Sequence, residues 1–104
     1  MRVAYIAGPY RSDTPSGIYK NIQNARAIAL YYWGLGYAVI CPHMNTALFD
    51  GAQDDSVWMN GYIEIVKRCD VIVMTGDWRK SDGSIKELNT AEAAGLEVIY
   101  HSYS

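Results

Sequence analysis

The sequence has little of several things that mark common classes of protein. Only two of its 104 residues are cysteine and two are histidine, too few for a disulfide-dense scaffold. Nine Lys and Arg against eleven Asp and Glu give a formal charge of −2, without the broad basic surface that non-specific binding of a nucleic-acid polymer needs. The N-terminus, MRVAYIAGPY, is too short and too soon interrupted for a signal peptide or a membrane span. We therefore expect a cytoplasmic protein with neither a membrane nor a nucleic-acid polymer as partner.

The motifs of the common phosphate and metal sites are absent as well. No G-x-x-x-x-G-K-[ST] occurs, and the first apolar run is followed by AGPYRSDTPSG rather than G-x-G-x-x-G. Cys41 and His43 are only two residues apart, and no paired C-x-x-C accompanies them as a zinc site of that type needs. We expect neither a metal ion nor a cofactor. Cys41 and Cys69 are interpreted as small core residues in a reducing compartment.

What the sequence does contain is a regular alternation of elements. Half of the residues are hydrophobic and 19% are charged, a globular composition that predicts one domain over residues 1–104. β-Branched and aromatic runs predict strands, and apolar residues at three- and four-residue spacing predict helices. The expected strands are 2–7, 37–41, 70–75 and 96–101, and the expected helices are 16–36, 56–69 and a third from Ser84. Residues 43–55 are predicted to form a long irregular loop, a kind of segment that is usually functional.

Strands that alternate with helices and are continuously apolar predict parallel β-α-β units with both faces of the sheet covered. The fold class is therefore α/β, a small doubly wound sheet of about four strands. In such sheets ligands bind beyond the carboxyl ends of the strands, where strand order reverses. The polar residues expected there are Tyr10, Arg11, His43, Asn45, Asp77, Ser81, Asp82 and Glu87. His43, just past a strand, is more typical of a loop hydrogen-bonder than of a catalyst.

Glu87 has two interpretations. Ser84-Ile-Lys-Glu87 fits the capping box S-x-x-E, with Ser84 as N-cap and Glu87 returning to its backbone N–H. A carboxylate in the first turn after the third strand also stands at the ligand end of the sheet. From the pattern alone the capping role is favoured.

Three segments carry a resemblance that bears on this choice. YIAGPYR, CDVIVM and SDGSIKELNTAEAAGLEVI resemble the nucleoside 2-deoxyribosyltransferase-like superfamily, and in particular a small branch of bacterial and phage proteins of the DUF4406 type. The resemblance covers nearly the whole chain and implies a flavodoxin-like or Rossmann-like fold. It also implies cleavage of the N-glycosidic bond of nucleosides or their 5′-monophosphates, with the sugar passed to another base or to water.

The same resemblance implies roles for individual residues. The nucleophilic glutamate falls on Glu87, the sugar-contacting tyrosine on Tyr5, and a phosphate-contacting arginine near Arg11. Ser81 matches a polar contact to sugar or phosphate. The remaining substrate-binding residues expected from the matching motifs are Gly8, Pro9 and Gly83.

The chain departs from the family pattern at one position. Relatives often carry an aspartate eight residues before the aspartate that opens the third strand, and this chain has Tyr62 there. A departing base must be protonated, and Asp77 and Asp82 are the remaining candidates. Two functions therefore stay open: an N-glycosidase or deoxyribosyltransferase, and a non-catalytic module that binds a nucleotide or an ADP-ribose-like ligand.

Aromatic residues predict self-association. Three Trp and nine Tyr are more than a four-stranded sheet hides easily, and ALYYWGLGY gathers four of them at residues 29–37. Exposed aromatic patches commonly mark interfaces. We expect a homodimer or a higher homo-oligomer, formed through residues 29–37 or through the helix that contains Trp58.

Overall fold

The computed structural model describes residues 1–101 and has one parallel sheet of four strands. The strands are β1 (Val3–Ala7), β2 (Ala38–Ile40), β3 (Val71–Met74) and β4 (Glu97–Tyr100). Their order is β2-β1-β3-β4, and each neighbouring pair is parallel. Strand order therefore reverses between β1 and β3, because the chain moves outward from β1 to β2 in one direction and from β3 to β4 in the other.

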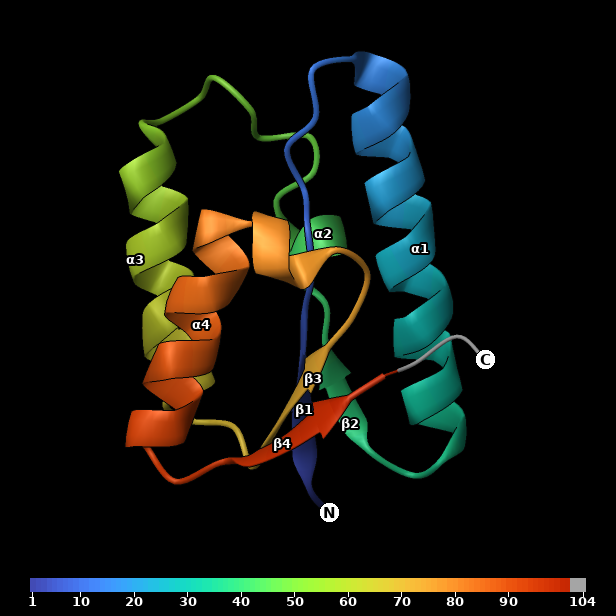
Figure 1. Ribbon diagram of the computed structural model, residues 1–104, viewed down its shortest axis with the longest axis vertical. Helices are drawn as coiled ribbons and strands as arrows, with labels where there is room; N and C mark the ends of the chain where they lie inside the picture. Colours follow the sequence, from blue (N-terminus) through green and yellow to red (C-terminus); the bar gives the residue numbers. More distant parts are fainter. Residues whose placement is uncertain (102–104) are drawn as a thin grey trace.

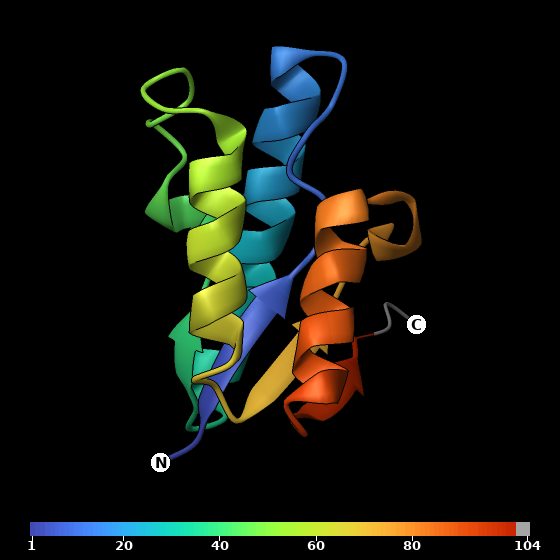
Figure 2. The same cartoon turned by 90° about the vertical axis from the view of Figure 1, so that its left-hand side faces the viewer.

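Helices cover both faces of this sheet, as Figures 1 and 2 show. Helix α1 (Pro15–Gly34) lies on one face, and α3 (Asp55–Val66) and α4 (Asp82–Ala93) lie side by side on the other. Two shorter elements, α2 (Pro42–Asn45) and a 3-10 helix η1 (Trp78–Lys80), follow β2 and β3. The predicted doubly wound α/β architecture is confirmed.

The side chains of β1 point alternately to the two faces of the sheet, so this short strand contributes to the hydrophobic cluster on each face. Ala4 and Ile6 pack into the cluster beneath α1, and Tyr5 and Ala7 pack into the cluster beneath α3 and α4. Successive side chains of a strand point to opposite faces, so a strand covered on both sides has no polar position. All four of these residues are fully or almost fully buried.

The carboxyl ends of β1 and β3 approach closely. Thr75 N–H donates to the carbonyl of Ala7 at 2.9 Å, which extends the pairing of the two strands by one residue. At the next position, a Cβ on Gly8 would lie 2.9 Å from the carbonyl oxygen of Thr75. Only glycine fits there without a backbone shift, and the β1 loop is thereby held against the β3 loop.

Several sequence-based boundaries are wrong, and α3, predicted to end at Cys69, ends at Val66. Residues 43–55 are not wholly irregular, because Pro42, at a first helical position that suits proline, opens the single turn of α2. Helix α4 begins at Asp82, not Ser84, with Ser81 as its N-cap. Helix α1 ends at Gly34, two residues before the predicted end.

The cysteines and helices bear on two further expectations. Cys41 and Cys69 are both free thiols, and they pack against the clusters on opposite faces of the sheet. Burial raises the pKa of each thiol, as befits small core residues.

No helix within residues 1–101 combines the length and the apolar character that crossing a membrane requires.

Candidate functional site

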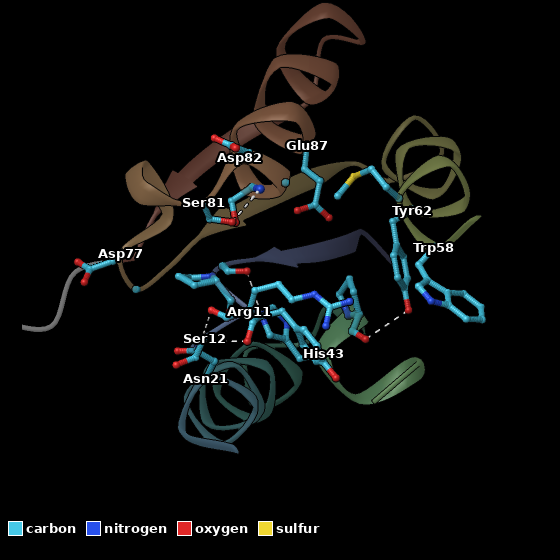
Figure 3. Close-up of a pocket in the computed structure, with 18 of the residues that line it drawn as sticks. Arg11, Ser12, Asn21, His43, Trp58, Tyr62, Asp77, Ser81, Asp82 and Glu87 are labelled. Carbon is cyan, nitrogen blue, oxygen red and sulfur yellow. Dashed lines mark hydrogen bonds between the residues drawn. The ribbon is translucent and has the colours of Figure 1, made fainter. Parts of the chain in front are cut away.

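A large pocket opens at the carboxyl edge of the sheet, where strand order reverses. Its volume is about 1330 Å³. The loops after β1 and β3, helix α2, and the first halves of α1, α3 and α4 all contribute to its lining. The position matches the rule for doubly wound sheets, and Figure 3 shows the side chains that converge on it.

Glu87 occupies the centre of the upper wall in Figure 3, and its carboxyl group points into the pocket. It comes from the second turn of α4 and is only 7% exposed. The hydroxyl of Tyr5, from β1, donates a hydrogen bond to its Oε2. Within residues 1–101 no second hydrogen bond reaches this carboxyl group, so Oε1 is left for a ligand.

The capping-box interpretation of Glu87 is wrong. The N-cap of α4 is Ser81, whose Oγ accepts from the backbone N–H of Ser84 at 3.2 Å. Ser84 is itself buried and donates its hydroxyl to Ser81 Oγ at 2.9 Å. Glu87 therefore lies one turn too far along the helix to return to the cap, and its carboxyl group turns to the pocket instead.

Burial dominates the electrostatics of this pair. It raises the pKa of Glu87 to about 7, and the hydrogen bond from Tyr5 opposes this only in part. The pKa of Tyr5 is also raised, first by burial and then by the neighbouring Glu87, so Tyr5 stays protonated as a donor. Tyr5 is fully buried and does not line the pocket. Its hydroxyl supports the carboxyl group from behind, and the direct sugar contact expected from the resemblance stays a prediction.

The β1 loop forms the opposite wall. Gly8, Pro9, Tyr10 and Arg11 all line the pocket. Tyr10 donates to Asp50 Oδ2 at 2.9 Å, and Arg11 Nη2 lies 2.6 Å from Asp55 Oδ1 in an exposed ion pair. These contacts tie the loop to the segment that leads into α3.

Asn21, in α1, holds the same loop from the other side. Its Nδ2 donates to the carbonyls of Tyr10 and Arg11 at 3.1 and 3.3 Å. The main chain that carries the Arg11 guanidinium is therefore fixed by hydrogen bonds, although its side chain is exposed.

His43 is a buried hydrogen-bonder, and it lies in α2. Its Nε2 lies 3.0 and 2.9 Å from the carbonyl oxygens of Gly8 and Pro9. Carbonyls only accept, so Nε2 carries the proton and Nδ1 is an acceptor. Burial lowers the pKa of His43, which keeps the ring neutral at physiological pH. His43 thus fixes α2 to the β1 loop.

Tyr62 performs a similar task between α3 and α2. Its hydroxyl donates to the carbonyl of Pro42 at 3.3 Å, accepts from Asn45 Nδ2 at 3.3 Å, and lies 2.8 Å from Thr46 Oγ1. Asn45 is not among the residues that line the pocket, and its amide is engaged by Tyr62. The Tyr62 ring lies edge-on to Tyr5, with centroids 6.4 Å apart.

The β3 loop supplies the remaining expected residues. Asp77, Ser81, Asp82 and Gly83 all line the pocket. Figure 3 shows Asp77 and Asp82 on the side away from Tyr62, with the Asp82 carboxyl group directed away from that of Glu87. Neither aspartate stands beside Glu87.

One face of α3 was not expected at the site. Asp55, Trp58, Met59 and Tyr62 line the pocket at positions i, i+3, i+4 and i+7, which share one side of a helix. From the sequence this helix was expected only as a possible surface for self-association. The spacing marks the shared face, but only the fold shows that its first two turns extend beyond the sheet into the site.

The described residues offer no metal centre. Between residues 1 and 101, no group of three or more His, Cys, Asp or Glu side chains is arranged to hold an ion. Cys41 and His43 also face different partners, because the thiol packs against the core beneath α1 and the imidazole binds the β1 loop.

Comparison with known proteins agrees with part of the resemblance. Residues 2–100 match the family model described as "Domain of unknown function (DUF4406)", and the chain belongs to this family. No curated protein sequence matches it.

Proposed function

We propose that this protein cleaves or transfers at the N-glycosidic bond of nucleosides or nucleoside 5′-monophosphates, with Glu87 as nucleophile. The observation that carries the proposal is the buried carboxyl group of Glu87, which points into a large pocket at the switch point of the sheet and is supported from behind by Tyr5.

The chemistry uses both oxygens of the carboxyl group. Breaking the bond from C1′ to the base nitrogen builds positive charge on the sugar, and a carboxylate against C1′ stabilises it. Tyr5 holds Oε2, so Oε1 attacks C1′ while the bonding electrons leave with the base. Water or a second base then displaces the ester oxygen and releases the carboxylate.

The ionisation state of Glu87 suits this role near neutral pH. With a pKa of about 7, the group is half ionised there, and a carboxylate with a raised pKa is a stronger nucleophile than an ordinary one. Burial that raises the pKa also removes water from the attacking oxygen. Base release should therefore rise with pH through about 7 on its acid limb.

The wall opposite Glu87 is suited to the rest of the ligand. Attack at C1′ places the base on the far side of the sugar, where Figure 3 shows Arg11 and His43. Trp58 and Met59 add an apolar side to the same pocket. A guanidinium binds a phosphate bidentately, and Arg11 projects from a loop fixed by Asn21.

A second function is favoured by a specific observation. Tyr62 is held in three hydrogen-bonding contacts, and Figure 3 shows neither the Asp77 nor the Asp82 carboxyl group directed toward that of Glu87. A pocket with Tyr62 at the position where relatives carry the aspartate suits a module that binds a nucleotide or an ADP-ribose-like ligand without turnover.

The deciding experiment compares Glu87→Gln with the unmutated protein on a panel of nucleosides and 5′-monophosphates, with released base measured by chromatography. Glutamine keeps the hydrogen bond to Tyr5 but cannot attack C1′, so base release should fall by about three orders of magnitude or more. Ligand affinity, measured by calorimetry, should persist.

Glu92→Gln is the matched control, because Glu92 lies on the same helix and is exposed. It should release base at the original rate. Binding without base release in the unmutated protein would establish the non-catalytic module, and equal rates for Glu87→Gln and the unmutated protein would end the nucleophile assignment.

A further inference from the structure

Helix α1 is apolar on two sides. One side packs on the sheet through Ala25, Ile28, Ala29 and Tyr32, which are all buried. The second side faces outward and lines a surface groove of about 480 Å³. Its residues are Ala27, Leu30, Tyr31, Gly34 and Leu35. The outward residues recur at i, i+3, i+4, i+7 and i+8, so they form one continuous stripe.

Within residues 1–101 this outward stripe is largely exposed, and the one ring contact given for its members with a residue outside α1 joins Tyr31 to His101, with centroids 5.6 Å apart. Leu30, Tyr31 and Leu35 are 68%, 55% and 57% exposed, and Figure 1 shows no other element on the outer side of α1. A helix that is hydrophobic all round is normally buried all round. The earlier half of the same outer side carries the polar residues Lys20 and Gln23, so the uncovered apolar surface is confined to the last turns of α1.

We propose that this stripe is covered by the same stripe of a second copy of the chain, packed antiparallel about a two-fold axis. Side-chain size along it reads small, large, large, small, from Ala27 through Leu30 and Tyr31 to Gly34. The order is the same in both directions. An antiparallel copy therefore sets Leu30 against Tyr31 at the centre and Ala27 against Gly34 on either side, where the small residues let the helices approach.

The charges of α1 favour the same partner. In a two-fold contact the same residues of both copies lie together near the axis, so a charged residue there would lie close to an identical charge. Residues 27–36 contain no charged residue. The nearest charge, Arg26, comes to lie beside Leu35 of the partner in this arrangement. The last turn of α1 has no basic residue of its own, and a cation there is favourable because the helix dipole leaves partial negative charge at that end.

The other predicted interface is less suitable. Trp58 is half-buried and lines the pocket, and Phe49 packs on its ring with centroids 5.7 Å apart. Its indole is therefore turned inward. Glu64, on the outer side of α3, forms an exposed ion pair with Arg68 in the turn that follows the helix, which is ordinary solvated surface.

Sedimentation velocity over a range of protein concentrations tests the proposal. The unmutated protein should sediment as a species whose mass is twice the 11.6 kDa of one chain. Leu30→Glu places two carboxylates at the centre of an uncharged contact and should raise the dissociation constant about tenfold or more. Leu48→Glu is the control, because Leu48 is 96% exposed and lies outside α1; this variant should stay dimeric.

Oxidative cross-linking tests the geometry without relying on a disruptive variant. In the antiparallel arrangement two copies of residue 31 lie near the axis, so Tyr31→Cys should form a covalent dimer rapidly. Lys20→Cys, more than two turns away on the same outer side, should not. A monomer at every concentration, a dimer unaffected by Leu30→Glu, or equal cross-linking of the two cysteine variants would each overturn the proposal.

Discussion

At the scale of single residues, burial couples the ionisation of Glu87 to the stability of the fold. The pKa of Glu87 is about 7 in the folded protein against an ordinary 4.5, so the folded state holds this proton more tightly than the unfolded state does. The resulting stabilisation is fully present below pH 4.5 and is lost as the pH rises through about 7.

This coupling predicts how Glu87→Gln changes stability. Glutamine is neutral at every pH, so the variant should keep the stability that the unmutated protein loses between pH 4.5 and 8, a difference of about 3 kcal/mol. Urea unfolding at several pH values measures it. Glu92→Gln, on the exposed side of α4, should follow the unmutated protein, and so should Glu87→Gln if the carboxyl group were solvated.

Arg11 gives a second prediction at this scale. Its guanidinium is paired with Asp55 in an exposed contact, and a phosphate must compete for it. Arg11→Ala should remove any preference for a 5′-monophosphate over its nucleoside. Asp55→Asn should strengthen that preference by about two- to fivefold, the worth of an exposed ion pair.

Isothermal titration with both ligands provides the measurement. Arg68→Ala is the control, because Arg68 is an exposed arginine just after α3 that is also paired with a carboxylate, that of Glu64. A preference that survives in Arg11→Ala would place the phosphate elsewhere.

At the scale of elements, the start of α4 shows how two similar patterns compete. Ser81 lies three residues before Ser84, and Ser84 lies three residues before Glu87. The pattern S-x-x-E therefore marks Ser84 as the more regular N-cap. The structure uses Ser81, because a tertiary contact, the hydrogen bond from Tyr5, takes Glu87 into the pocket. A pattern within one helix contains no information about that contact.

The cap itself is testable. Ser81→Ala removes the acceptor for the N–H of Ser84 and leaves the Ser84 hydroxyl, buried, without its partner. It should lower the free energy of unfolding by about 1–2 kcal/mol. Asn89→Ala, on the exposed side of the same helix, should change it little or slightly raise it. Equal effects of the two variants, measured by urea unfolding, would contradict the assignment of Ser81.

At the scale of the whole molecule, the fold and the place of the site follow from the sequence, and the detail of the site does not. The runs at β1 and β3 are apolar at every position because both faces are covered, and this predicts a parallel sheet with its pocket at the carboxyl edge. The supporting role of Tyr5 and the pocket-facing side of α3 depend on how separate elements meet in space, which local periodicity does not specify.

Sheet order also has a consequence for the time course of synthesis. β1 is the first strand made, yet its partner β3 ends at Met74, so one edge of β1 stays unpaired while most of the chain is produced. Tyr5 and Glu87 are 82 positions apart, so α4 must be made and packed against the Tyr5 face of β1 before the two side chains meet. The hydrogen bond between them is thus formed late, and its appearance in a refolding experiment would report the completed molecule rather than either half.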